Sequence, residues 1–231
     1  MRSRIVCTAL LIAALVFVDI RPADGSPAVR AVGSAYVCAG SPVPPGWVIS
    51  SAEKLIGRNC PGLTYRIENS AGRSTMFMCN SGKAPAGWVI ESTGKFPGHP
   101  CPGPTYVIKS TAGQSAMYMC SVSKLPAGWV IEHTDRVPTC YGPRYRIRNP
   151  VGQTHLAICS VSPLPANWVI TGIGSFPPRS CYGPTYQIAH VAGKTTMSIC
   201  QRSPVPNGWV VVSWHDSRHC LGRAASIRKM I

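Results

Sequence analysis

The residues best suited to chemistry lie in the segment "SWHDSRHC" near the C-terminal end of the chain. Its side chains Trp214, His215, Asp216 and His219 could hold a metal ion or form a His–Asp acid–base pair. No pairing of a serine, cysteine or carboxylate with a neighbouring histidine recurs from copy to copy, and the acids beyond residue 25 are only Glu53, Glu68, Glu91, Glu132, Asp135 and Asp216. The sequence also has no glycine-rich phosphate loop and no close cysteine pair of the zinc-binding kind. We therefore expect no enzyme, no cofactor and no bound metal.

Basic side chains offer a different chemistry, the recognition of anions. Beyond residue 25 the chain holds 20 Lys and Arg against 6 Asp and Glu, and such a balance favours acidic polysaccharides, lipid headgroups or nucleic acids as partners. A surface that is basic only for solubility is the alternative. The densest patch is "RYRIRNP", with Arg144, Arg146 and Arg148.

Further binding candidates lie in loops that differ in sequence and length from one copy of a repeat to the next. Variable loops on a fixed scaffold are where recognition usually resides. Their basic candidates are Lys54, Arg58, Lys95, Arg136, Arg179 and Arg218. The aromatic candidates for sugar stacking are Phe77 and Tyr118, because they alternate with residues expected to be buried.

A repeat of about forty residues must position these side chains. Each copy has a cysteine followed nine residues later by a tryptophan, which is Trp47, Trp88, Trp129, Trp168 or Trp209. The phasing predicts five modules: module 1 (31–71), module 2 (72–112), module 3 (113–151), module 4 (152–192) and module 5 (193–231). The preceding residues are interpreted as a signal peptide (1–25) and a linker (26–30).

Ten cysteines remain once Cys7 is assigned to the signal peptide, and an even number in an exported chain indicates disulfides. The simplest pairing joins the two cysteines within each module: Cys38–Cys60, Cys79–Cys101, Cys120–Cys140, Cys159–Cys181 and Cys200–Cys220. A rival scheme pairs Cys60 with Cys79, continues in that register, and closes a ring through Cys38–Cys220. Both schemes place the chain in a secreted, extracellular setting, or in the periplasm of a bacterium.

Each module is expected to form three short strands. Alternation predicts that the tryptophan and the isoleucine of "GWVI" share the buried face and that the tryptophan packs on the disulfide of its own module. The valine and the following acid, as in Val89 and Glu91, are expected to face water. The preceding "P-x-G" predicts a turn whose third residue has a positive φ.

The sequence therefore predicts an all-β fold of five tandem disulfide-stapled modules, arranged as an elongated array or a closed ring. It favours a secreted, non-enzymatic binding or structural repeat protein that engages an anionic or polysaccharide surface, in the manner of a lectin. The alternative is a secreted inhibitor or toxin-like effector that acts on a protein partner through its variable loops. An acidic polysaccharide or cell-surface glycan is the expected partner; nucleic acid and an integral membrane segment after signal removal are not expected.

Overall fold

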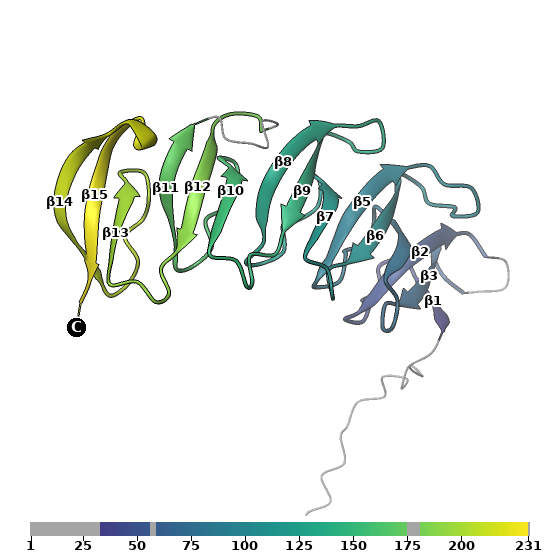
Figure 1. Ribbon diagram of the computed structural model, residues 1–231. Coiled ribbons are helices and arrows are strands. Elements are labelled where there is room, and N and C mark those ends of the chain that lie inside the picture. Colours follow the sequence, from purple (N-terminus) through teal and green to yellow (C-terminus); the bar gives the residue numbers. More distant parts are fainter. Residues whose placement is uncertain (1–32, 56–58, 175–180, 231) are drawn as a thin grey trace, which may run out of the picture. The chain divides into compact units, whose positions relative to one another are not determined.

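The computed structural model describes residues 33–55, 59–174 and 181–230. The predicted signal peptide and linker, and the loop candidates Arg58 and Arg179, lie outside the described residues. Within the described ranges the chain forms fifteen strands in five three-stranded antiparallel sheets, which confirms the all-β prediction. Figure 1 shows the five sheets following one another in chain order.

Every sheet takes its three strands from one module, and the strand order is always first–third–second. The strands are β1 (Ser34–Cys38), β2 (Trp47–Glu53) and β3 (Thr64–Asn69); β4 (Thr75–Cys79), β5 (Trp88–Gly94) and β6 (Thr105–Ser110); β7 (Ala116–Cys120), β8 (Val130–Arg136) and β9 (Pro143–Arg148); β10 (His155–Cys159), β11 (Trp168–Gly174) and β12 (Thr185–His190); and β13 (Thr196–Cys200), β14 (Trp209–Ser217) and β15 (Gly222–Lys229). One 3-10 helix, η1 (Arg218–Cys220), precedes β15.

Alternating side chains divide each sheet into two faces. In module 2, Met76, Ile108 and Ile90 lie opposite one another across the three strands, and all three are buried. We call this side, which carries the tryptophan and the isoleucines, the core face. The other side, which carries residues such as Arg66 and Arg146, is the outer face.

The turn before each second strand forms as predicted. Its glycines have φ values of 75–78°, and Asn167 occupies the same position with φ 63°. The tryptophan N–H donates to the proline carbonyl three residues earlier, as in Trp88 to Pro85 at 3.1 Å. Glycine and asparagine recur here because other residues adopt this left-handed backbone only at a cost.

All five disulfides join the two cysteines of one module, so the internal pairing scheme is confirmed. Their position relative to the cores was not anticipated. Trp47, Ile49 and Ile67 of module 1 cluster with Cys79 and Cys101, which form the disulfide of module 2. The same holds for the cores of modules 2, 3 and 4, each of which contains the cysteines of the following module. The prediction that each tryptophan packs on the disulfide of its own module is therefore wrong.

The valine that follows each tryptophan links the modules in the opposite direction. Val48, Val89, Val130 and Val169 are at most 1 % exposed, because each joins the core of the next module. The prediction that these valines face water is therefore wrong. The cores of modules 2, 3 and 4 therefore each combine the valine of the preceding module, residues of the module itself and cysteines of the following module.

The acids of the second strands were predicted on the same water-facing side. A β-bulge follows the isoleucine of the second strand in modules 1 to 4 and Val211 in module 5, so two residues there oppose a single residue of the third strand. Glu91 lies at such a bulge and remains partly exposed, whereas Glu132, at the same position of module 3, is buried. The prediction that the acid at this position faces water is therefore wrong for Glu132, which pairs with Arg146 and Arg148.

Hydrogen bonds also connect consecutive modules. We call the contact between the second strand of one module and the following module the joint. The second strand is the edge of its sheet, and its outward N–H groups find partners in the next module. The amides of Ile90, Ile131 and Ile170 donate to the hydroxyls of Ser123, Ser162 and Ser203 at 2.9–3.0 Å. We call these three residues the joint serines.

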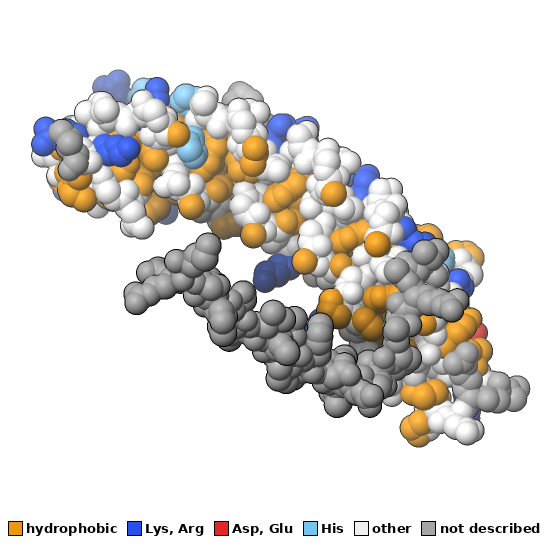
Figure 2. All heavy atoms as spheres, turned by 90° about the horizontal axis from the view of Figure 1, so that it is seen from below, with side chains coloured by type: hydrophobic (Ala, Val, Ile, Leu, Met, Phe, Trp, Pro, Cys, Tyr) orange, Lys and Arg blue, Asp and Glu red, His pale blue; other side chains and the backbone are white. Residues whose placement is uncertain are grey.

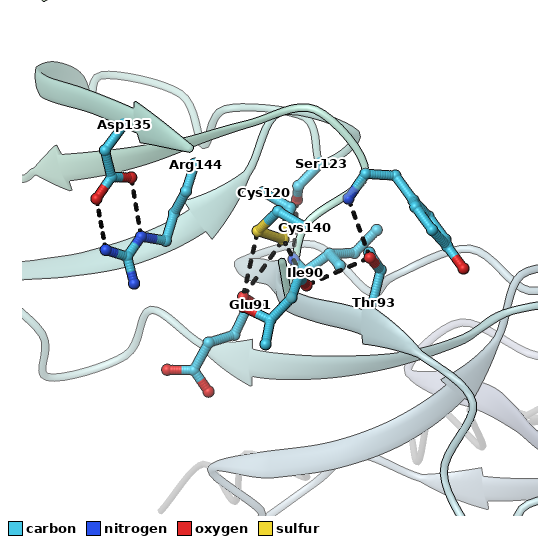
Figure 3. The surroundings of a disulfide bond; sticks show 10 residues. Ile90, Glu91, Thr93, Cys120, Ser123, Asp135, Cys140 and Arg144 are labelled. Carbon is cyan, nitrogen blue, oxygen red and sulfur yellow. Dashed lines mark hydrogen bonds and ion pairs between the residues drawn. A yellow bond between two sulfur atoms is a disulfide. The ribbon is translucent and has the colours of Figure 1, made fainter. Parts of the chain in front are cut away.

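Figure 3 shows the joint between modules 2 and 3, where the Cys120–Cys140 disulfide lies against the edge of β5. The Sγ atom of Cys120 is 3.4 Å from the carbonyl oxygen of Glu91. The Thr93 amide donates to the Thr139 carbonyl at 2.7 Å, and the Thr93 hydroxyl accepts from the Tyr141 amide at 3.1 Å. Each joint is thus both apolar and hydrogen-bonded.

Candidate functional site

The "RYRIRNP" arginines lie on the third strand of module 3, where acidic side chains surround them. Arg144 Nε donates to Asp135 Oδ1 at 3.0 Å, and Arg146 Nε lies 2.9 Å from Glu132 Oε1. Arg148 also pairs with Glu132, which is buried. All three predicted binding arginines therefore form ion pairs with acids of their own module.

The Asp135–Arg144 pair also shifts the titration of both groups. The hydrogen bonds from the Arg144 guanidinium lower the pKa of Asp135 below its ordinary value. The same hydrogen bonds raise the pKa of Arg144. Figure 3 shows the two side chains meeting end to end across β8 and β9. This geometry stabilises the sheet and leaves little of the Arg144 charge for a ligand.

The two aromatic candidates are placed differently from each other. Phe77 stacks on His99 with ring centroids 3.9 Å apart and also contacts Phe96 at 5.3 Å, so it forms a small aromatic cluster on module 2. Tyr118 is 39 % exposed, and the Arg144 guanidinium lies 4.3 Å from the centre of its ring. Tyr118 is therefore the more accessible of the two.

The predicted loop cations of modules 1 to 3 are exposed: Lys54, Lys95 and Arg136. Arg136 lies 6.0 Å from the ring centre of Tyr182, in the following module. Arg218 begins the 3-10 helix η1 in module 5. The structure thus distributes these candidates over several modules instead of gathering them into one cluster.

Module 5 carries a concentration of basic side chains of which the sequence analysis singled out only Arg218. Its basic side chains are Lys194, Arg202, Arg218, Arg223, Arg228 and Lys229, against one acid, Asp216. In the described part of the chain none of these six lies within 4.0 Å of a carboxylate, and all are exposed. Counting acids module by module in the sequence would have revealed this imbalance.

The six cations of module 5 fall into two groups at opposite ends of its sheet. The disulfide-end arginines are Arg202, Arg218 and Arg223, which flank Cys200 and Cys220; the Gln201 amide donates to the Arg223 carbonyl at 3.0 Å. The other group is Lys194, Arg228 and Lys229, near the hydrogen bond from the Lys229 amide to the Thr195 carbonyl. Arg223 also lies 5.3 Å from the ring centre of Trp214, which is 44 % exposed.

Three open depressions lie between the P-x-G-W turns of consecutive modules. They measure about 630 Å³ between Trp47 and Trp88, 790 Å³ between Trp88 and Trp129, and 680 Å³ between Trp129 and Trp168. Figure 2 looks onto this edge, where hydrophobic side chains recur over successive modules. Trp88 lines two depressions and is partly exposed, whereas the other four repeat tryptophans are at most 8 % exposed.

The segment "SWHDSRHC" forms the end of β14 and the helix η1. His215 Nε2 lies 3.4 Å from the hydroxyl of Ser198. In residues 33–55, 59–174 and 181–230, no group of three or more His, Cys, Asp or Glu side chains is arranged to hold a metal ion. The same ranges contain no helix long and apolar enough to cross a membrane.

Comparisons with known proteins give no relative for this arrangement. The sequence matches no family model, and neither the curated proteins nor the solved structures yield a match.

Proposed function

We propose that this chain is a secreted, non-enzymatic binding protein that engages an anionic polysaccharide, chiefly through module 5. The observation that carries the proposal is the set of six exposed basic side chains in module 5 that are not ion-paired with its single acid. The five disulfides are consistent with an oxidising, extracellular setting.

Module 5 differs from module 3 in how its charge is used. In module 3, Glu132 and Asp135 already neutralise most of the charge of three arginines. An exposed cation without a carboxylate partner can offer its full charge to sulfate or carboxylate groups of a polymer, since no intramolecular bond must first be broken. The partly exposed Trp88 and the neighbouring depressions offer apolar surface for sugar rings on modules 1 to 4.

Retention on a sulfated-polysaccharide resin eluted with a salt gradient tests the proposal. The test variant replaces the disulfide-end arginines Arg202, Arg218 and Arg223 with glutamine. The control variant replaces Lys54, Lys95 and Arg136 with glutamine; these are also exposed, lack ion pairs in the described ranges, and remove the same net charge. We expect the test variant to elute at clearly lower salt than the control, because exposed charges act within a Debye length of about 10 Å at 0.1 M salt.

Equal elution of the two variants would contradict the assignment to module 5. Failure of the unmodified chain to bind any acidic resin would refute the electrostatic proposal itself. A stoichiometric, salt-resistant complex with a protease or receptor would instead support the alternative of a secreted inhibitor.

A further inference from the structure

The two terminal modules each expose one half of the joint that links all the others. In modules 1 to 4 the valine after the tryptophan is buried by the following module, yet Val210 at this position of module 5 is 37 % exposed. Val211 is also 37 % exposed, whereas its equivalents Ile49, Ile90, Ile131 and Ile170 are at most 7 % exposed. The edge of β14 therefore presents the apolar surface that elsewhere receives a neighbouring module.

Module 1 exposes the complementary half. The first cysteines of modules 2 to 5 are 0 % exposed, because the preceding module covers them, whereas Cys38 is partly exposed. The core of module 1 also differs from the cores that follow. Among the described residues, it contains no valine from another module, while the core of module 2 contains Val48.

A serine in module 1 matches the unfilled hydrogen bond of module 5. The joint serines Ser123, Ser162 and Ser203 lie three residues after the first cysteine of their modules and accept the edge amide of the preceding one. Module 1 has Ser41 at this position, and Ser41 is exposed. The corresponding amide in module 5 is that of Val211, and among the described residues no serine hydroxyl is bonded to it. Ser41 can supply that acceptor from a second copy.

A second position is matched in the same way in the joints between modules 1 and 2, 2 and 3, and 3 and 4. The joint between modules 4 and 5 differs, because Ile173 has no hydroxyl and the Leu221 amide donates to the Arg218 carbonyl of its own module at 3.4 Å. Where the second strand offers Thr93 or Thr134, the next module has Tyr141 or Tyr182, whose amide donates to the threonine hydroxyl. Where the second strand offers Ala52, without a hydroxyl, the next module has Pro102, which lacks an N–H.

A joint from module 5 to module 1 follows the second of these combinations. Trp214 occupies the hydroxyl position, and Pro61 occupies the position of the donor. No N–H group would therefore lose its hydrogen-bond partner at this position when the two surfaces meet.

We propose that module 5 of one copy docks onto module 1 of a second copy, through the same joint that links consecutive modules within the chain. Val210 would enter the core beside Ala35 and Val37, as Val48 joins Met76 and Met78. The Cys38–Cys60 disulfide would cover Trp209 and Val211. Because the two surfaces differ, the contact is heterologous, so copies add head to tail into an open polymer or a closed ring.

Sedimentation of the purified chain over a wide range of concentrations tests the proposal. We expect the weight-average mass to rise with concentration to at least twice that of one chain, and to do so in high salt, since the joint is apolar. Val210→Asp should weaken association about tenfold or more, the effect typical of a buried interface residue. The matched control is Val151→Asp, which alters a valine that is 81 % exposed and belongs to neither joint surface; it should leave association unchanged.

A mixing experiment distinguishes a head-to-tail contact from any symmetric one. Ser41→Asp places a charge on module 1 at a site that is exposed in the single chain but buried in the joint. Val210→Asp and Ser41→Asp should each be monomeric alone and should form a dimer when mixed, because each retains the surface that the other lacks. The double variant carries both substitutions and lacks both joint surfaces. It should therefore remain monomeric alone and when it is mixed with either single variant.

Three results would overturn the proposal. The first is a monomeric unmodified chain at its highest soluble concentration. The second is equal association of the Val210→Asp and Val151→Asp variants. The third is self-association of Val210→Asp that equals that of the unmodified chain. Salt-resistant association also separates this joint from the proposed polysaccharide binding, which must weaken with salt.

Discussion

Val130 provides the sharpest test of how neighbouring modules stabilise one another. It belongs to the second strand of module 3, is 0 % exposed, and packs in the core of module 4 with Ile158 and Ile188. Val210 is the same residue at the same position of module 5, but it is 37 % exposed. Val130→Ala and Val210→Ala, made as separate variants, therefore compare the same truncation at a joint covered by the next module and at one that no module of the chain covers.

The expected difference follows from burial. Val130→Ala removes the equivalent of two methylene groups, worth about 1.6 kcal/mol when fully buried, and leaves a cavity that increases the loss. We expect the free energy of unfolding to fall by about 2–3 kcal/mol. Measured on the unassociated chain at low concentration, Val210→Ala should cost about 1 kcal/mol or less, because part of its side chain already contacts water and an open surface leaves no cavity.

Guanidinium unfolding with the disulfides intact measures the two free energies, and amide hydrogen exchange locates the loss. Val130→Ala should reduce protection in β10 and β12 of module 4 as well as in module 3. Equal destabilisation by the two substitutions, or a loss confined to β7, β8 and β9, would refute the conclusion that each valine stabilises the module after its own.

Three further outcomes are expected. Trp214 is 44 % exposed in the single chain, so iodide should quench its fluorescence strongly at low, non-associating concentration, and Trp214→Phe should remove most of the quenchable signal; an unchanged quenchable fraction would contradict this. Asp135→Asn should cost about 1 kcal/mol near neutral pH. Because Arg144 lowers the folded-state pKa of Asp135, this contribution is complete above the unfolded pKa of about 3.9 and is lost as the pH falls through the lower folded value. Unfolding curves of Asp135→Asn that stay equally displaced from the unmodified chain at pH 7 and pH 2 would contradict the ion pair. Replacing Cys200 and Cys220 together by alanine should cost about 3 kcal/mol on the loop-entropy estimate and should also loosen module 4, as seen by hydrogen exchange in β11; a loss limited to module 5 would argue against the shared core.

The candidate site was predicted only in part. The sequence pointed to Arg144, Arg146 and Arg148 because "RYRIRNP" is the densest basic patch of the chain. It did not reveal that Glu132 and Asp135 lie beside them, since that depends on the bulge and register that join β8 to β9. The unpaired charge of module 5 was visible in the sequence as a local shortage of acids, but it became informative only after the ion pairs elsewhere were known.

The sequence by itself determined the features that each module decides locally. The recurring cysteines, the P-x-G turns and the alternation within the short strands are short-range signals, because a turn, a strand face and a loop closed by about twenty residues involve only neighbouring chain. They predicted five three-stranded modules and favoured the internal disulfide pairing, while leaving one rival scheme open.

Only the tertiary structure decided what lies across each module boundary. A half-buried strand has the same alternation whether its second face meets water or another module, so the pattern of Val89 and Glu91 could not show that the valine is buried in the next core. For the same reason, the tryptophans could not reveal which disulfide covers them. A module of forty residues is too small to enclose its own apolar surface, and the tertiary structure meets this requirement by completing each core with a disulfide from the neighbour that follows.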